Sequence, residues 1–590
     1  MISPSLEQAR RQSGFVPVQK DFRDHVRAGF SRLVRLWTSL QVSYHGGKYS
    51  IERVLALDKY TRTTSLFRVT LVCTATPLPM VILVALQELL PLQEPETGWG
   101  HNYGFWFRVF MLAAAVSHTY LIQGKYMIND FAHSNGQLAV FVLGISVIYV
   151  AVGMLVGANL VFPIPFFYIT MTPAFSVPLF TLLYYLLGSS EKLTKYVAFI
   201  AAQKMMGMIY PVYQLLFRTV SSTHFVLPVI LLLPVLKLLV KNVVLRLIAQ
   251  LEDLTPETVI FTVDFYNALY PATCMESAST LNTMLIFIVT DFAQTITVLV
   301  EMHRRTATIL SRLRQATNTP KSKNVLSALP SLFHNSSMVE AQFRGGVQVR
   351  SCLQHELDRE DRQLLRLLER LPLKASPSPP QLYCWSSIKK PRFETRTLPK
   401  LRLSSFFSFR VGSLTAVQPF SSPLIISKRR LGRVAGGPNG IPTDLIEHSN
   451  IPRETLEVLY TTECLVLTTY LESFIPLIYC TYMIFMVHLP NAKYHTELKS
   501  VTRQNVKYTA RVVFLFGLLQ LVSFVLLILL VRHNCGMRIL YNLAFVLDTQ
   551  MWLVQGKLII WMLVTLACRV VHFGQIATEW ENGLYVESIP

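Results

Sequence analysis

The sequence is poor in charged side chains. Only 15% of its 590 residues are charged and 51% are hydrophobic, whereas about 25% are charged in a typical soluble protein. Residues 138–160 contain no charged side chain, and ~20 such residues span the ~30 Å hydrocarbon core as a helix. A soluble helix rarely stays apolar on every face for that length. The sequence therefore predicts an integral membrane protein surrounded by a lipid bilayer.

The chain also lacks motifs for catalysis or cofactor binding. The phosphate-binding pattern G-x-x-x-x-G-K-[ST], the dinucleotide pattern G-x-G-x-x-G, and the patterns H-E-x-x-H and G-x-S-x-G are all absent from it. No two of its eight cysteines form a C-x-x-C pair, and no histidines cluster at metal-binding spacing. We therefore expect no cofactor, metal site or catalytic residue, and a function that is not enzymatic.

Basic residues are concentrated in one long polar segment. Residues 303–453 hold 25 Lys and Arg against 9 Asp and Glu, whereas the rest of the chain has 30 against 26. Nucleic acid could attract such a segment, but beside apolar spans it is more typical of a cytoplasmic loop near anionic lipid headgroups. Its Ser- and Pro-rich composition predicts a largely disordered loop. We expect no nucleic-acid partner.

The apolar runs predict an all-α polytopic bundle with about eleven spans, nine to twelve being compatible with the pattern. A cytoplasmic arm (1–60) precedes a first membrane block of about eight spans (61–302). The basic loop (303–453), a second block of about three spans (454–575) and a short acidic tail (576–590) follow. The predicted spans are Leu66–Leu90, Phe105–Gln123, Leu138–Leu160, Phe166–Leu187, Val197–Phe217, Phe225–Val240, Val259–Met275, Leu281–Val300, Leu465–Leu489, Val512–Val531 and Met551–Val571.

Charge supports this topology. Eight crossings return the chain to its starting side, and both the arm and the loop are basic, which places them in the cytoplasm. Arg108 and Arg218 fall toward the opposite side and are the weakest points of this topology. The run Val259–Met275 is also weak, and a re-entrant segment there would break the count. Pro77 and Pro79 predict a kinked or split first span.

Two polar regions contain amphipathic patterns. In the arm, Phe22, Val26, Phe30, Leu33 and Trp37 recur at helical spacing beside arginines. Such a helix suits the membrane surface or packs on the protein's own helix ends. In the loop, leucines between Leu353 and Leu371 alternate with charged residues. This segment either covers the cytoplasmic ends of the spans or docks on a partner or the bilayer.

Ionisable groups inside the spans are the best functional lead, because each costs at least ~2.5 kcal/mol at a helix centre without a partner or water. They are Lys204, Lys237, Asp264, Asp291, Glu463 and Glu472. We expect Asp291, Glu472, Lys204 and Asp264 to form an intramembrane polar path. Structural ion pairs are the alternative, such as one between Asp291 and Lys204. Gly153-x-x-x-Gly157 predicts close approach of a neighbouring helix.

Several strings together resemble an expanded family of multi-pass membrane proteins found in oomycetes such as Phytophthora. The resemblance covers both membrane blocks and implies a membrane location and a lineage, but supplies no catalytic or binding residues. The strings are Thr61-Arg-Thr-Thr-Ser65, Thr76-Pro-Leu-Pro79, Asn102-Tyr-Gly-Phe-Trp106, Val259-Ile-Phe-Thr-Val-Asp-Phe265, His303-Arg-Arg-Thr306, Thr462-Glu-Cys-Leu-Val466 and Leu553-Val-Gln-Gly-Lys557.

Three functions remain open at this point. The favoured one is a transporter or channel-like protein for an ion or small molecule that the sequence does not identify. A receptor or scaffold acting through the basic loop is the second. A membrane-embedded enzyme is the least favoured. The default location is the plasma membrane or another membrane of the secretory pathway.

Overall fold

The described part of the computed structural model is all-helical. It comprises residues 49–128, 134–188, 191–220, 226–248, 254–277, 348–353, 355–370, 451–498, 501–535 and 537–573, with six single residues between 289 and 304. These residues belong to one compact unit. They contain no strand, only an isolated bridge between His495 and Val570. The amphipathic pattern of the arm, the acidic tail and Asp291 lie outside the described residues.

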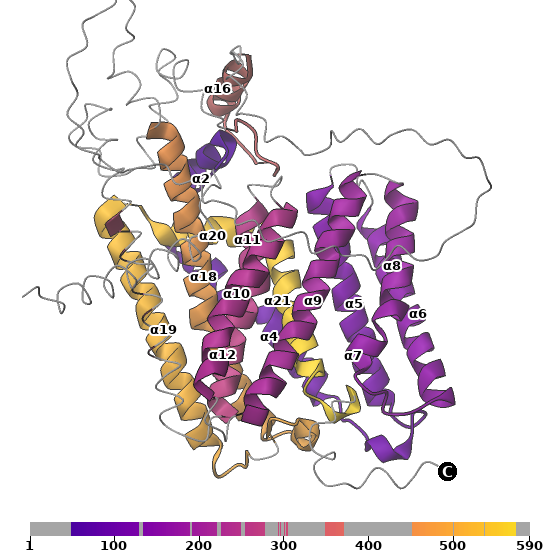
Figure 1. Ribbon diagram of the computed structural model, residues 1–590. Helices are drawn as coiled ribbons and strands as arrows, with labels where there is room; N and C mark the ends of the chain where they lie inside the picture. Colours follow the sequence, from indigo (N-terminus) through magenta and orange to yellow (C-terminus); the bar gives the residue numbers. More distant parts are fainter. Residues whose placement is uncertain are drawn as a thin grey trace, which may run out of the picture. The chain divides into compact units, whose positions relative to one another are not determined.

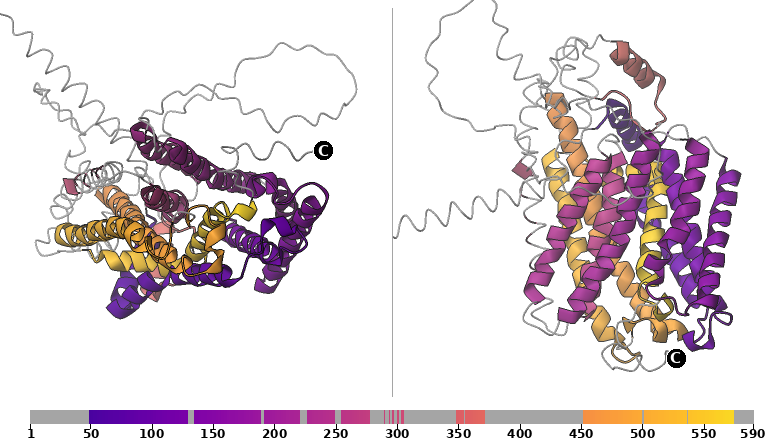
Figure 2. Two further views of the ribbon diagram at one scale, coloured as in Figure 1. Left: turned by 90° about the horizontal axis from the view of Figure 1, so that it is seen from below. Right: turned by 45° about the vertical axis from the view of Figure 1, so that its right-hand side comes forward.

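The long helices run side by side, and α2 and α16 lie beyond one end of them (Figures 1 and 2). Short helices and connectors close the opposite end (Figure 1). The elements are α2 Ile51–Thr63, α3 Leu66–Ala75, α4 Leu78–Leu89, η2 Pro95–Thr97, α5 Tyr103–Met127, α6 Asn135–Asn159, α7 Phe167–Thr170, α8 Thr172–Leu187, α9 Glu191–Val220, α10 Val226–Ile248, α11 Thr255–Val259, η4 Ile260–Asp264, α12 Phe265–Ser277, α16 Arg359–Arg370, α18 Ile451–Met486, η6 Pro490–Tyr494, α19 Val506–Cys535, α20 Ile539–Thr549, α21 Met551–Ala567 and η8 Val571–Phe573.

Six helices of the described residues are long and apolar enough to cross a membrane. They are Leu66–Leu89, Tyr103–Met127, Asn135–Asn159, Phe167–Leu187, Thr455–Met486 and Val506–His533, and a seventh span results if the bent pair α20–α21 counts as one. The eleven predicted spans are therefore confirmed only as a helical bundle with six or seven candidate spans. Each has apolar side chains on its outer face, such as Leu155 on α6, which is 62% exposed.

The first span is split where prolines were expected to interrupt it. α3 ends at Ala75, and α4 begins at Leu78 with Pro77 in the capping position. A proline supplies no backbone donor and clashes with the preceding turn. By contrast, α6 is uninterrupted. It begins at a capping box in which Ser134 and Gln137 exchange side-chain and backbone hydrogen bonds.

Helix α18 joins the two predicted membrane blocks into one bundle. It packs against α19 of the second block and against α11, η4 and α12 of the first. The hydroxyl of Tyr470 on α18 also donates to the carbonyl of Cys73 on α3 at 2.7 Å. The predicted run began at Leu465, but α18 begins at Ile451. The first turns of α18 contain polar residues, so a hydropathy pattern does not assign them to a span.

The weak run at Val259–Met275 does not reverse direction. α11, η4 and α12 follow one another with right-handed helical backbone angles at both junctions. Every described side chain from Pro256 to Cys274 is buried in the bundle, with Val259 and Phe265 fully so. A re-entrant segment is therefore wrong here. The run looked weak because this helix is surrounded by protein and tolerates polar side chains.

The last predicted span is bent at its start. α20 and α21 meet at an angle of 83°, and Gln550 between them is fully buried. α20 contacts α2 and α3, whereas α21 contacts α4 and α5. The predicted run Met551–Val571 thus corresponds to α21 and the turn after it. The buried helix α20 that precedes it was not predicted.

The segment of the basic loop with leucines between Leu353 and Leu371 packs against the helical bundle. α16 contacts α2, and Leu365 on α16 is fully buried in the main core. The backbone amide of Ile51 donates to the carbonyl of Gln348 at 3.0 Å. Lys59 on α2 pairs with Asp358 at 2.9 Å. These contacts agree with the interpretation that this leucine-rich segment covers the ends of the long helices.

Candidate functional site

Two members of the predicted polar path meet in one buried cluster of charges. Lys237 Nζ on α10 lies 3.3 Å from an oxygen of Asp264 on η4 and 3.1 Å from one of Glu472 on α18. Lys241, one turn after Lys237, lies 3.4 Å from the second oxygen of Asp264. The hydroxyl of Thr468 donates to that oxygen at 2.8 Å. This Lys237 cluster contains two cationic and two anionic side chains, so its formal charge balances.

A π-helical turn presents Asp264 to the cluster. η4 has this wider geometry over Ile260–Asp264, and π-turns inside helices occur frequently at functional sites. Asp264 is fully buried, and Lys237 and Lys241 are each under 10% exposed. Taking a charge out of water costs several kcal/mol, and a partner offsets this cost only in good geometry. The four ionic side chains therefore depend on one another.

The two other members of the predicted path are Lys204 and Asp291. Lys204 on α9 does not join the Lys237 cluster among the described residues. Its ammonium donates to the Ser176 hydroxyl and lies 4.7 Å from the centre of the Phe175 ring, a cation–π contact. Asp291 lies outside the described residues, so its pairing with Lys204 stays a prediction.

A second cluster surrounds Arg53 near the start of α18. Arg53 Nη2 lies 2.9 Å from Glu257 on α11 and 2.7 Å from Glu463 on α18. The hydroxyl of Tyr49 donates to Glu463, and the amide of Gln550 donates to Glu257. All five members of this Arg53 cluster are at most 1% exposed. The bend between α20 and α21 thus lies directly beside a buried ionic network.

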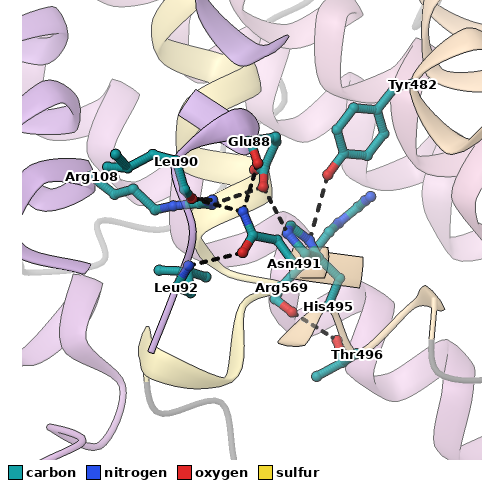
Figure 3. A network of polar contacts seen from close by, with 9 residues as sticks. All are labelled: Glu88, Leu90, Leu92, Arg108, Tyr482, Asn491, His495, Thr496 and Arg569. Atoms are coloured by element: carbon teal, nitrogen blue, oxygen red, sulfur yellow. Dashed lines mark hydrogen bonds and ion pairs between the residues drawn. The ribbon is translucent and has the colours of Figure 1, made fainter. Parts of the chain in front are cut away.

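A third cluster lies at the other end of α18, where α4, α5 and the connector after α18 meet (Figure 3). Arg108 donates to Glu88 at 2.9 Å, and His495 Nε2 lies 3.3 Å from the same oxygen. The Asn491 amide donates to the backbone carbonyls of Glu88 and Leu90 at 2.6 and 2.8 Å. Arg108, one of the two weakest points of the predicted topology, is therefore neutralised by Glu88. Figure 3 shows these four side chains converging.

A fourth cluster adjoins it around Arg569. Arg569 lies 2.5 Å from Glu497, which also accepts from Tyr479 at 2.9 Å and from Gln214 at 2.7 Å. The amide of Thr496 donates to the carbonyl of Arg569 at 3.0 Å. These contacts attach the turn after α21 to α9, α18 and the connector.

The nearby ring of His572 is held in its neutral form. It lies in η8, outside the candidate spans, where burial lowers its pKa from 6.5 to about 4. Its Nε2 donates to the carbonyl of Gln93 at 2.6 Å, and its ring stacks on Phe105. The hydrogen bond to Gln93 opposes this lowering of the pKa, whereas the positive charge of Arg108 contributes to it.

Helix α18 contributes to all four clusters. Glu463 belongs to the Arg53 cluster, Glu472 to the Lys237 cluster and Tyr479 to the Arg569 cluster, while the Tyr482 hydroxyl lies 3.5 Å from His495. At 1.5 Å per residue, Glu463 and Glu472 lie ~13 Å apart along the axis, and Tyr482 is ~15 Å further. Polar side chains therefore follow one helix over most of its length.

The sequence identified part of this arrangement. Lys237 and Glu463 were recognised as ionisable groups within spans but were not placed on the path. Lys241 was missed, although its spacing of four residues from Lys237 puts both on one helix face. Arg53 and Glu257 were missed because they lie outside the apolar runs. Among the described residues, no group of three or more His, Cys, Asp or Glu could hold a metal ion.

Comparisons with known proteins give no relative. No family model, no curated protein and no solved structure matches the chain. The resemblance to an oomycete membrane-protein family therefore stays a prediction, and the site is interpreted from its own chemistry.

Proposed function

We propose that the protein is a transporter or channel-like membrane protein whose polar path follows α18 through the Lys237 cluster. The observation that carries the proposal is the buried meeting of Lys237, Lys241, Asp264 and Glu472. Ionisable groups at bilayer depth are costly and typically mark ion or substrate pathways. An arriving cation could replace a lysine at Asp264 or Glu472 when the displaced ammonium releases its proton, which keeps the formal charge of the cluster balanced.

Interrupted helices support the same proposal. The π-turn at η4, the split between α3 and α4 and the bend at Gln550 each interrupt the regular α-helical geometry inside the bundle. Transporters use discontinuous helices of this kind beside substrate and ion sites. The α20–α21 bend adjoins the Arg53 cluster, so one interruption lies next to charges that a conformational change could rearrange.

The proposal includes eleven spans. Besides the six or seven candidates, these are α9, α10, the continuous α11–η4–α12 helix and the predicted run at Leu281–Val300. α9 has 30 residues and α10 has 23, lengths of ~45 and ~34 Å at 1.5 Å per residue. In the last run, Val289, Ile296 and Val300 are helical and 44–57% exposed, as lipid-facing residues would be.

This topology places the arm and residues 303–453 in the cytoplasm, where their basic side chains would meet anionic headgroups. The plasma membrane or another secretory-pathway membrane is the proposed location. A receptor or scaffold acting through the basic loop stays an alternative prediction, because most of that loop lies outside the described residues. The proposal involves no enzymatic step.

Ion flux in reconstituted vesicles tests the path. The full chain would be placed in liposomes, and movement of H⁺, Na⁺ and K⁺ followed with entrapped fluorescent indicators. Asp264→Asn and Glu472→Gln should each lower the flux about tenfold or more, since a hydrogen bond to a charged group contributes about 1.5–3 kcal/mol. Asp291→Asn tests the remaining predicted member of the path.

Glu191→Gln is the matched control, because Glu191 lies at the exposed start of α9 and its side chain is 83% exposed. This variant should conduct as the wild type does. Asp264→Glu keeps the charge and should restore part of the flux. If Asp264→Asn and Glu472→Gln proteins insert normally and carry a measured flux at the wild-type rate, the path does not pass this cluster.

A further inference from the structure

Several buried polar side chains carry atoms without a hydrogen-bond partner among the described residues, and four of them lie on three helices that contact one another. In these four, the atoms are both amide atoms of Gln203, the hydroxyls of Tyr210 and Tyr266, and the indole nitrogen of Trp561. All four side chains are fully buried. We call Gln203, Tyr210, Tyr266 and Trp561 the aromatic cluster. None of its members belongs to the four ionic clusters.

The four residues lie together although they come from three helices. Gln203 and Tyr210 are seven residues apart on α9, two helical turns, and therefore share a face. The rings of Tyr210 and Tyr266 stack with centres 4.8 Å apart, and the Trp561 ring lies 5.3 Å from that of Tyr266. Helices α9, α12 and α21 contact one another, so the cluster lies at their common interface.

Gly207 brings further hydroxyl groups to the same face of α9. A methyl group at this position would lie 3.6 Å from the Tyr266 hydroxyl and 3.1 Å from the Tyr168 hydroxyl. Gly207 lies one turn after Gln203. The hydroxyls of Tyr168 and Tyr266 thus converge on the backbone of α9 one turn after Gln203. The result is a concentration of donors and acceptors in an otherwise apolar interface.

Unpaired groups of this kind are costly. Each buried donor or acceptor left without a partner costs about 1–3 kcal/mol, and such groups in native proteins call for an explanation. Neighbouring tyrosines show that the bundle readily supplies partners. Tyr213 on the same helix donates to the carbonyl of Val229 at 3.2 Å, and Tyr196 donates to that of Tyr120. Other such atoms lie elsewhere in the core, on Asn102 and Thr462 for example, but Tyr210, Tyr266 and Trp561 carry theirs on adjoining aromatic rings.

We propose that the aromatic cluster binds a small uncharged solute with hydroxyl or amide groups. Its members are neutral and offer both donors and acceptors, so they suit a molecule that carries both. Lys204 directly follows Gln203, but its ammonium binds the Ser176 hydroxyl and lies over the Phe175 ring. Asp264 precedes Tyr266 by two positions and is already balanced in the Lys237 cluster. A charged ligand would gain no counter-ion from the aromatic cluster itself. That the bound solute is also carried across the membrane rests on the proposed function; its binding does not.

Fluorescence of Trp561 tests the binding step. The full chain in detergent would be titrated with urea and with glycerol, and the emission of a Trp561→Phe variant subtracted from that of the wild type. Binding should give a saturable shift in this difference spectrum. Tyr266→Phe and Gln203→Leu should weaken the apparent affinity about fivefold each, the effect of losing one hydrogen bond.

Tyr213→Phe is the control on the same helix. It removes a hydroxyl that is already paired, so it should leave the titration unchanged while lowering the melting temperature. Tyr266→Phe should raise the melting temperature without solute, because it removes an unpaired buried hydroxyl. If that hydroxyl instead had a structural role, Tyr266→Phe would lower the melting temperature. If the difference spectrum does not respond to either solute, the cluster holds ordered water only and the proposal is wrong.

Solute uptake separates this proposal from the proposed function. The same vesicles used for ions would be mixed with urea or glycerol and their swelling followed by light scattering. A saturable Trp561 response without uptake of solute or ions keeps the binding site and rejects a transport function. Ion flux without any Trp561 response keeps the proposed function and rejects the site. Uptake that Tyr266→Phe and Gln203→Leu slow supports both.

Discussion

Arg53 donates to Glu463 at 2.7 Å across 410 residues of sequence. The arginine lies on α2 near the end of the N-terminal arm, whereas the glutamate lies on α18 after the long basic loop. Arg53 also binds Glu257 on α11, so one guanidinium connects three distant parts of the chain. The prediction that both membrane blocks form one bundle therefore has a specific physical basis at this end of α18.

We expect Arg53→Met to be strongly destabilising. The substitution leaves Glu257 and Glu463 buried without their cation, and breaking a buried pair costs about 3–5 kcal/mol. Thermal unfolding in detergent should show a melting temperature several degrees below that of the wild type. Adding Glu257→Gln and Glu463→Gln should restore most of it, because the uncompensated charges are then removed.

Arg62→Met provides the control for this series. Arg62 lies on the same helix, but its side chain is 68% exposed and pairs only with Asp58 one turn away. Exposed pairs contribute about 0–1 kcal/mol. An Arg53→Met protein as stable as the Arg62→Met protein would contradict the structural role given to the Arg53 cluster.

His572 predicts a specific loss of stability in acid. Its pKa falls from 6.5 to about 4 on folding, so between these values the unfolded chain binds a proton that the folded chain does not. The stabilisation is therefore complete above about pH 6.5 and declines as the pH falls toward about 4. Melting temperatures between pH 7.5 and 4.5 should fall more steeply for the wild type than for His572→Gln. Parallel curves for the two proteins would assign the acid sensitivity to other groups.

Two glycines on α6 predict opposite responses to the same substitution. A methyl group on Gly153 would lie 3.0 Å from the ring of Trp106 on α5, whereas Gly144 has no atom within 4 Å of that position. Gly153→Leu should therefore force α5 and α6 apart and lower the melting temperature. Gly144→Leu should raise it, because leucine favours a helix over glycine by roughly 0.5–1 kcal/mol. Equal effects at the two positions would argue against this close packing.

Hydropathy located the helices whose apolar side chains face outward from the bundle, but not those that other parts of the protein bury. Leu138–Leu160 predicted α6 well because most of α6 faces outward. α20 was missed because it has only 11 residues, too few for a span. α2 and the first turns of α18 were missed because their polar residues are buried in ion pairs, as Arg53 and Glu463 are. Partners far apart in sequence create these pairs, and no local pattern reveals them. For the same reason, Asp264 and Glu472 were identified as candidates, but their meeting at Lys237 was not.

The proposed orientation predicts where the protein can accept sugar. Asn335-Ser-Ser337 is a sequon for N-glycosylation, and the proposed topology places it in the cytoplasm, away from the glycosylation machinery. The tail after α21 is proposed to lie on the opposite side. Its Asn582-Gly-Leu584 becomes a sequon through Leu584→Thr. All of these residues lie outside the described residues, so the prediction tests the topology alone.

Expression in microsomal membranes measures the outcome as an electrophoretic shift that endoglycosidase removes. The wild-type chain should show no shift, and Leu584→Thr should add one glycan. The double variant Asn582→Gln with Leu584→Thr should lose it again, which assigns the sugar to that asparagine. A glycan on the wild-type chain at Asn335 would reverse the orientation. It would place the basic loop on the lumenal side, because an even number of crossings ties the loop to the arm.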